Sequence, residues 1–217
     1  MEIEQREYQT FIVEKVSSLT GQGYNVVIEL DCGMGKRVIM YRLLKEIFPN
    51  KRVVIFLHSQ SSLQETYKYL TEEYGDIRQI GYIRSGISAQ QKKYIVDTNL
   101  IILTLPTVFN NLLTRFPELS KTIDVIIINE VDKIIRRVSS RDILIMPWRK
   151  LLQTLEGAKV IGLSGTLRDD HVILDINQYK LRQELKTLLK YLKSAKLISI
   201  EDFIDTDIQE YIQYTEI

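Results

Sequence analysis

A glycine-rich turn that ends in lysine and arginine has the residue types of a phosphate-binding loop. Its seven residues are Asp31, Cys32, Gly33, Met34, Gly35, Lys36 and Arg37. Glycines let backbone N–H groups close around phosphate oxygens, the following helix adds the positive end of its dipole, and a lysine reaches the outer phosphates. We therefore expect Gly33, Met34, Gly35 and Lys36 to hold a nucleotide. A tight strand-to-helix turn with a surface lysine is the plainer alternative.

The loop departs from the full pattern G-x-x-x-x-G-K-[ST] at both ends. Leu30 stands at the first position, and Arg37 stands where Ser or Thr would ligate magnesium. The sequence therefore predicts weak ATP binding at most and argues against a bound Mg²⁺. Arg37 is either an ordinary surface residue or a cation that takes the place of the magnesium.

Two further polar clusters follow apolar runs downstream. Asn129 and Glu130 come directly after the run 125–128, and Ser164 and Thr166 end a later run. Phosphate-loop enzymes place an acidic pair at such a strand end, with Asp for magnesium and Glu to position the attacking water. Asn129 can hydrogen-bond but brings no charge to a metal, whereas Glu130 keeps the catalytic carboxylate. Glu130 could instead pair with a neighbouring cation and close the pocket.

The elements that position these clusters are predicted to form an α/β fold, because short apolar runs alternate with helical patterns. Strands are predicted over 26–30, 53–57, 79–83, 100–103, 125–128 and 160–163. Helices are predicted over 8–18, 36–48, 61–74, 89–96, 106–114, 148–155 and 177–192. Such runs suit a mostly parallel sheet covered by helices on both faces. Ligands bind beyond the carboxyl ends of parallel strands, so the polar clusters should meet in one crevice.

Composition limits the class of protein. The 217 residues are 45% hydrophobic, which suits a core domain over 1–168 and a C-terminal helical appendage over 169–217. The net charge of +1 excludes a global basic field, so nucleic acid must bind through a local patch. Cys32 is the single cysteine, which favours a cytoplasmic location. His58 and His171 lack metal-ligand spacing, and the N-terminus is not a signal peptide, so we expect no zinc and no membrane partner.

The order of several segments resembles the first RecA-like domain of superfamily 2 helicases, in the archaeal Hef, Fanconi-anaemia-type and RIG-I-like group. Arg6-Glu7-Tyr8-Gln9 is similar to the family's adenine-reading Arg-x-Tyr-Gln, and the phosphate loop to its Pro-Thr-Gly-x-Gly-Lys-Thr. The Asn129 segment stands where the family has Asp-Glu-Ala-His, and the Ser164 segment where it has Thr-Ala-Ser or Ser-Ala-Thr. The segments 56–63, 85–88, 103–113 and 206–212 also follow the family's order.

This resemblance implies a P-loop fold and roles for particular residues. It implies adenine contact for Arg6 and Gln9, and coupling between sites for Ser164 and Thr166. The positions that would touch the DNA or RNA backbone are Ser59, Gln60, Ser61, Thr104 and Thr107. The departures are Arg37, Asn129 and Asp132, which replace the family's Thr, Asp and His. They predict a degenerate site that does not hydrolyse ATP efficiently alone, since the arginine fingers belong to a second RecA-like domain beyond this chain.

Three functions remain open from the sequence. The first is a helicase-like domain with a degenerate nucleotide site that binds nucleic acid weakly and without sequence preference. The second is the N-terminal part of an active ATP-dependent DNA helicase or translocase, which would be a helicase-type ATPase completed by another domain or subunit. The partners considered are DNA or RNA, a second helicase domain, and a repair or replication protein. The third is a protein-interaction module that reuses the fold. Arg136, Arg137 and Arg141, with 148–150, form a basic cluster that either binds phosphates or is a solvated loop.

Overall fold

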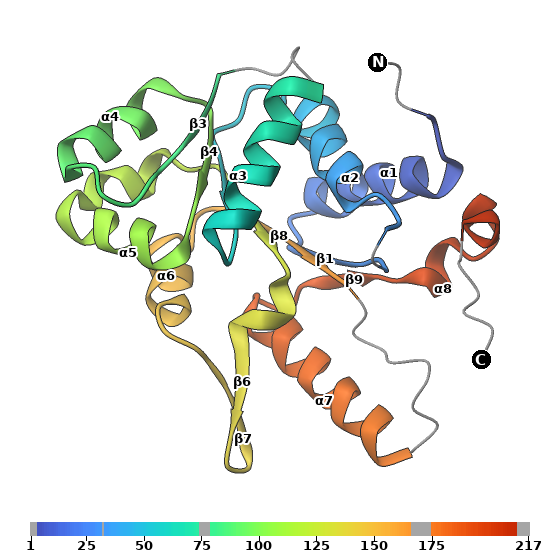
Figure 1. Ribbon diagram of the computed structural model, residues 1–217. Coiled ribbons are helices and arrows are strands. Elements are labelled where there is room, and N and C mark those ends of the chain that lie inside the picture. Colours follow the sequence, from blue (N-terminus) through green and yellow to red (C-terminus); the bar gives the residue numbers. More distant parts are fainter. Residues whose placement is uncertain (1–3, 32, 74–78, 166–174, 212–217) are drawn as a thin grey trace.

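The computed structural model describes residues 4–31, 33–73, 79–165 and 175–211, with side chains for all of these except 73 and 175–182. At its centre lies a seven-stranded sheet in the order β3-β4-β2-β5-β8-β1-β9 (Figure 1). Its strands are β1 Val26–Glu29, β2 Val53–Phe56, β3 Ile80–Tyr82, β4 Ile101–Thr104, β5 Val125–Asn129, β8 Lys159–Ser164 and β9 Lys196–Ile198. All of these neighbours pair in parallel, which confirms the predicted α/β class and RecA-like architecture.

Helices cover both faces of this sheet (Figure 1). The α-helices are α1 Glu7–Gly21, α2 Lys36–Arg42, α3 Gln60–Lys68, α4 Ala89–Thr98, α5 Pro106–Arg115, α6 Trp148–Thr154, α7 Asp175–Tyr191 and α8 Ile200–Phe203. The π-helical turns η1 Leu43–Ile47 and η2 Tyr69–Glu73 continue α2 and α3, and the 3-10 turns are η3 Pro117–Thr122, η4 Val131–Ile134 and η5 Asp207–Glu210. The seven predicted helices and six predicted strands therefore match elements of the structure.

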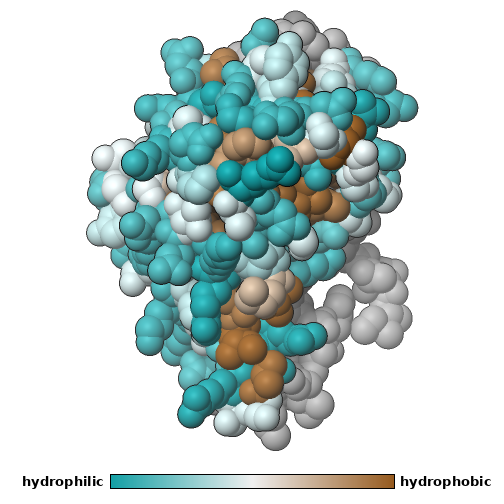
Figure 2. Space-filling model, turned by 90° about the vertical axis from the view of Figure 1, so that its left-hand side faces the viewer, coloured by the Kyte–Doolittle hydropathy of each residue, from teal (hydrophilic) through white to brown (hydrophobic). Residues whose placement is uncertain are grey.

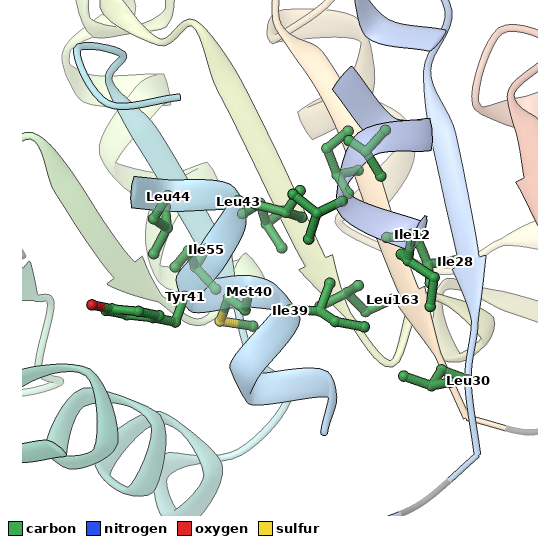
Figure 3. Close-up of a cluster of buried hydrophobic side chains, with 14 of the residues drawn as sticks. Ile12, Ile28, Leu30, Ile39, Met40, Tyr41, Leu43, Leu44, Ile55 and Leu163 are labelled. Carbon is green, nitrogen blue, oxygen red and sulfur yellow. The ribbon is translucent and has the colours of Figure 1, made fainter. Parts of the chain in front are cut away.

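Successive side chains of each strand point to opposite faces of the sheet, so the core forms two layers. Val26 and Ile28 of β1 point into the layer under α1, α2 and α3, whereas Val27 points into the layer under α4, α5, α6 and α7. In the first layer, Ile39 of α2 and Leu43 of η1 pack beside strand residues such as Ile28, Ile55 and Leu163 (Figure 3). Burial on both faces explains why the strand sequences are almost continuously apolar. The sheet, packed on both faces, fixes where the loops at its carboxyl edge begin.

An antiparallel hairpin extends from that edge and was not predicted. It consists of β6 Ile135–Val138 and β7 Arg141–Leu144, and it projects beyond the body of the molecule (Figure 1). The predicted basic cluster therefore lies on a β-hairpin and not on a loop. Trp148, which was grouped with that cluster, is instead 1% exposed and packs 5.2 Å from the ring of Phe56 in the core.

The C-terminal segment contributes to the sheet. β9 pairs with β1 as the edge strand, and Leu188 and Leu192 of the α7 region join the second core layer. Phe203 and Ile208 join the first layer beside α1. The predicted boundary between core and appendage falls among residues 166–174, which lie outside the described part of the chain, so the division at residue 168 stays a prediction.

Candidate nucleotide and nucleic-acid site

The phosphate loop lies at the carboxyl end of β1 and turns through two left-handed glycines. Gly33 has φ +83° and Gly35 has φ +86°, values that residues with a side chain rarely adopt. Lys36 then opens α2, and its Nζ donates to the carbonyl oxygen of Leu30 at 3.3 Å. A Cβ placed on Gly165, at the end of β8, would lie 3.3 Å from the same ammonium. Lys36 therefore lies between the ends of β1 and β8, and among the described residues its ammonium donates only to this neutral carbonyl oxygen.

The start of α1 braces the loop from behind. The hydroxyl of Tyr8 donates to the carbonyl oxygen of Met34 at 2.5 Å, and the amide nitrogen of Gln9 donates to the same oxygen at 3.3 Å. Gln9 is only 2% exposed, and a Cβ on Gly35 would overlap its amide. Gln9 therefore fixes the loop backbone, and in this geometry its side chain is not open to solvent. The predicted adenine contact of Gln9 stays a prediction.

Arg6 lies between two tyrosines from opposite ends of the chain. Its guanidinium donates to the Tyr8 hydroxyl at 3.2 Å and lies over the ring of Tyr211, 4.0 Å from the centroid. It also forms an exposed ion pair with Glu4 at 3.3 Å. One face of the guanidinium is thus already in contact with the tyrosine ring, and the predicted adenine contact of Arg6 stays a prediction.

The side chain of Arg37 turns toward α3. Its guanidinium pairs with the carboxylate of Glu65 on α3 at 3.0 Å and lies 5.6 Å from the ring centroid of Tyr69. Both partners lie on the α3 side of the loop, and the Arg37 side chain is 48% exposed. In this conformation Glu65 partly compensates the charge of Arg37, and the hypothesis that this charge substitutes for the metal stays a prediction.

Asn129 and Glu130 end β5, two strands away from the phosphate loop. Glu130 has φ +50°, which is uncommon for a residue with a side chain and turns the chain sharply into η4. Its carboxylate pairs with Lys133 at 2.8 Å, so the alternative pairing of Glu130 with a neighbouring cation is present. The pair is partly exposed and gives little stability. It does hold the candidate catalytic carboxylate in one place.

The strand ends of β5 and β8 are joined by a hydrogen bond. The hydroxyl of Ser164, which is fully buried, donates to the carboxylate of Asp132 at 3.0 Å. Asp132 replaces the His of the family's motif, and it nevertheless contacts the segment to which that His is expected to couple. Thr166, the second predicted coupling residue, lies outside the described residues.

His58 joins the ends of β2 and β5. Its Nε2 lies 2.8 Å from the carbonyl oxygen of Asn129, which can only accept, so this nitrogen carries the proton. Burial beside Trp148 lowers the pKa of the imidazole, against the opposing effect of that hydrogen bond. His58 is therefore neutral near pH 7. It connects the end of β5, where Asn129 lies, to the end of β2, where the predicted nucleic-acid contacts begin.

The residues predicted to touch a nucleic-acid backbone lie at the ends of β2 and β4, which are neighbours in the sheet. Ser59 caps α3 by accepting from the Ser62 amide at 3.1 Å, and Ser61 is exposed beside it. Gln60 reaches Ser85 after β3, at 3.5 Å. Thr107 is exposed in the first turn of α5, whose N-cap provides no side-chain acceptor.

Thr104 does not share this exposure. Its side chain is fully buried, and its hydroxyl donates to the carbonyl oxygen of Leu105 at 3.1 Å. It therefore shapes the turn into α5 and presents no group to a ligand. Four of the five predicted positions remain accessible at the edge, and the amides at the start of α3 and α5 lie next to them.

The donor set suits phosphate better than a divalent metal. Lys36 and the loop amides offer positive charge and N–H groups, which phosphate oxygens accept. Within the described part of the chain, no group of three or more His, Cys, Asp or Glu residues could hold a metal. The nearby carboxylates of Glu130 and Asp132 are engaged with Lys133 and Ser164. The residues thus fit a nucleotide's phosphates and do not fit a conventional magnesium site.

Known proteins share the parallel-sheet fold that orders these loops along one edge. Residues 2–169 match the family model ResIII, described as "Type III restriction enzyme, res subunit". The chain belongs to this family. The ResIII match confirms the resemblance to the first RecA-like domain of superfamily 2 helicases that the motifs indicated. A search of curated proteins found no match.

Among solved structures, the chain is similar to one described as "Crystal structure of Pyrococcus furiosus Hef helicase domain". The TM-score is 0.68 and the sequence identity 13%, so the likeness shows the fold. The match covers 98% of this chain and 41% of that one, so this ResIII chain spans about two fifths of the Hef helicase structure. No described helix of this chain is long and apolar enough to span a membrane.

Sequence reasoning assigned no contacts to Asp207, Tyr211 or His58, although the first two lie in the segment 206–212 that follows the family's order. Asp207 and Tyr211, which contact α1, lie about 200 positions away from their partners, and no local pattern reveals such pairing. His58 was considered only as a metal ligand, although it directly follows the predicted strand 53–57.

Proposed function

We propose that this chain is a helicase-type RecA-like domain that binds the backbone of nucleic acid and holds a nucleotide weakly, without hydrolysing it efficiently alone. The observation that carries the proposal is the convergence of the phosphate loop, the Asn129–Glu130 pair and Ser164 on the ends of three adjacent strands. Helicase-type domains use such an edge to join a nucleotide site to a nucleic-acid surface. A cytoplasmic location in association with nucleic acid follows from the same proposal.

Weak nucleotide binding is supported by what surrounds Lys36. The ammonium has a place for phosphate, but Arg37 turns toward Glu65 and Asn129 carries no charge. The hydroxyl and the carboxylate that would anchor magnesium are therefore missing. Glu130 remains as the candidate for positioning water. An arginine finger, worth about 10³–10⁵ in rate where it acts, would have to come from another domain.

Nucleic-acid binding is supported by the accessible donors at the ends of β2, β3 and β4. Ser59, Gln60, Ser61 and Thr107 are neutral hydrogen-bond donors, and the starts of α3 and α5 add backbone amides. Such groups contact sugar and phosphate without reading bases. With a net charge of +1, the domain should bind weakly and without sequence preference.

Calorimetric titration with ATP tests the nucleotide part of the proposal. The titration is done with and without Mg²⁺, and then repeated in the presence of forked DNA. We expect weak binding with an affinity that is nearly indifferent to magnesium. Lys36→Ala should abolish the heat of binding, whereas Lys45→Ala, a lysine at the far end of the same helical segment, should not. Tight ATP binding that disappears with a chelator would overturn the proposal.

A second candidate is the N-terminal part of an active helicase or translocase. The Ser164–Asp132 bond favours it, because the contact that would relay motion between the two motif segments is retained. The share of the Hef structure that the chain spans is also compatible with a second domain supplied elsewhere. A magnesium-dependent ATPase stimulated by DNA would identify this function. Failure to bind either nucleotide or nucleic acid would favour a protein-interaction module.

A further inference from the structure

The β6–β7 hairpin is a basic, exposed element that the proposed site does not use. In ten residues it carries three arginines and a single carboxylate, that of Asp142. Arg136, Arg137 and Arg141 are all exposed, and among the described residues no carboxylate pairs with them. Charged side chains without partners on a projecting element are available to a polyanion.

The hairpin has two different faces because its register is fixed. Arg136 lies opposite Ile143, and Val138 lies opposite Arg141, so these four side chains share one face. On the other face, Ile135 and Leu144 pack against the second core layer. One face therefore fixes the root of the hairpin to the body and carries Arg137 opposite Asp142 nearer the tip. The other face presents Arg136 and Arg141 beside Val138 and Ile143.

Apolar groups accompany the arginines on the surface. Val138 near the tip is 44% exposed, and Met146 just beyond β7 is 78% exposed. Figure 2 shows an apolar patch on the projecting part of the molecule, bordered by hydrophilic side chains. Arginine binds phosphate through its planar fork and stacks on bases, while small apolar side chains contact sugars and base faces. This combination suits nucleic acid better than a purely ionic ligand.

The root of the hairpin is packed against the sheet and directly follows the candidate catalytic segment. η4 Val131–Ile134 is followed by β6 without an intervening residue. The backbone nitrogen of Ile145 donates to the carbonyl oxygen of Ile134 at 2.9 Å and closes the root. Val131 is fully buried against Gly162 of β8, where a Cβ would come within 2.9 Å of its methyl groups. A force on the hairpin would therefore reach Glu130 and Asp132 through a packed connection.

A further anchor lies on the side of α7. The hydroxyl of Tyr191 donates to the backbone carbonyl oxygen of Asp142 at 2.9 Å. The carboxylate atom Oδ1 of Asp142 is buried without a hydrogen-bond partner in the described structure, and among the described residues Asp142 forms no ion pair with the arginines. The exposed charged side chains of the hairpin are thus its three arginines.

We propose that the β6–β7 hairpin is a second nucleic-acid contact, which binds the phosphate backbone where a duplex meets single strands. This inference rests on the proposed function, because it assigns one strand to the ends of β2 and β4 and a second stretch of backbone to the hairpin. The hairpin extends from the same edge of the sheet and reaches beyond it (Figure 1). A single strand held on the edge would satisfy only the first contact, whereas a branched substrate would satisfy both.

Fluorescence anisotropy with a single strand, a blunt duplex and a fork of shared sequence tests this, each prepared as DNA and as RNA. Replacing Arg136, Arg137 and Arg141 together by Ala should weaken binding of the fork about tenfold or more and that of the single strand less than about threefold. The slope of log K against log salt should fall by about 2 to 3. The corresponding triple Lys variant should keep most of the affinity, and thermal melting should show that both variants fold.

The matched control replaces Lys15, Lys68 and Lys121 by Ala, which removes the same charge from α1, α3 and η3. An equal loss in this control would overturn the proposal, because only net charge would then matter. Unchanged fork binding by the arginine variant would overturn it as well, while the proposed function would stand. If the unmodified protein binds none of the substrates at low salt, the proposed nucleic-acid function itself is wrong.

Discussion

The carboxylate of Asp207 caps the first helix at Tyr8 from the other end of the chain. Its two oxygens accept from the backbone nitrogens of Glu7 and Tyr8, each at 2.9 Å. Arg6, the N-cap residue of α1, provides no side-chain acceptor of its own. Because Tyr8 also holds the carbonyl of Met34, the C-terminal segment is connected through α1 to the phosphate loop.

Replacing Asp207 by Ala should therefore destabilise the protein. Loss of an N-cap acceptor costs about 1 kcal/mol, which lowers the melting temperature of a domain of this size by about 2–4 °C. Asp205→Ala, an exposed carboxylate two residues earlier, is the matched control and should leave the melting temperature nearly unchanged. Calorimetry measures both. Equal melting temperatures for the two variants would mean that the long-range cap contributes nothing.

Gly35→Ala should be costly for two reasons. The backbone has φ +86°, and the new Cβ would overlap the Gln9 amide that holds the loop. The left-handed conformation alone costs about 1–2 kcal/mol for a residue with a side chain. Gly157→Ala is the control, since a Cβ there meets nothing within 4 Å and its φ is not positive. Urea unfolding should show a loss of about 1 kcal/mol or more for the first variant and a change near zero for the second.

The apolar strands could be predicted from sequence because burial on both faces leaves continuous Val and Ile runs, as in 125–128. The hairpin could not. Half of β6 is arginine, and its turn passes through Ser139 at φ +57° without the Gly or Asn that usually marks such a turn. β9 has three residues, too few for a pattern. Short strands depend on neighbours that are distant in sequence.

The site was predictable by position but not by orientation. Sequence order placed the phosphate loop, Asn129 and Ser164 at strand ends, as the sheet shows. The direction of Arg37 depends on Glu65, which lies 28 residues away on another helix. The burial of Thr104 likewise follows from strand packing, which a motif does not encode.

His58 should make stability fall at mildly acidic pH. Burial lowers the pKa of its imidazole in the folded state, so the unfolded chain takes up this proton first as the pH falls below about 6.5. The contribution of His58 to the free energy of unfolding is therefore complete above about pH 6.5 and is lost progressively as the pH falls toward the lowered pKa of the folded state. His58→Gln keeps a neutral donor and removes the titration. The free energy of unfolding of the wild type should fall more steeply between pH 7 and pH 5, by at most about 1.4 kcal/mol per pH unit. Parallel profiles for the two proteins would contradict this.

The Ser164–Asp132 bond should appear as a coupling energy. A double-mutant cycle with Ser164→Ala and Asp132→Ala isolates the pair from its surroundings. Asp132 is exposed, so solvent screening limits the expected coupling to about 0.5–1 kcal/mol. The control cycle pairs Ser164→Ala with Asp124→Ala, a carboxylate at the opposite end of β5 that bonds to the Arg52 amide. Additive effects in both cycles would show that the two motif segments are not coupled in the resting domain.

Arg37→Thr combined with Asn129→Asp should restore the missing metal anchors. The new hydroxyl would directly follow Lys36, the new carboxylate would stand at the end of β5, and the exposed Glu65 pairing would be lost. Mg²⁺ should then strengthen ATP binding by about tenfold, the equivalent of 1.4 kcal/mol, whereas the unmodified protein should show no such dependence.

Turnover by this double variant should nevertheless stay low, because Glu130 remains paired with Lys133 and no arginine finger is supplied. Adding Lys133→Ala separates these two causes, since it frees the carboxylate alone. Titration calorimetry measures the binding, and phosphate release measures turnover. Brisk hydrolysis by the double variant as a monomer would show that one domain suffices, and that the two substituted residues, not a missing partner domain, limit this protein.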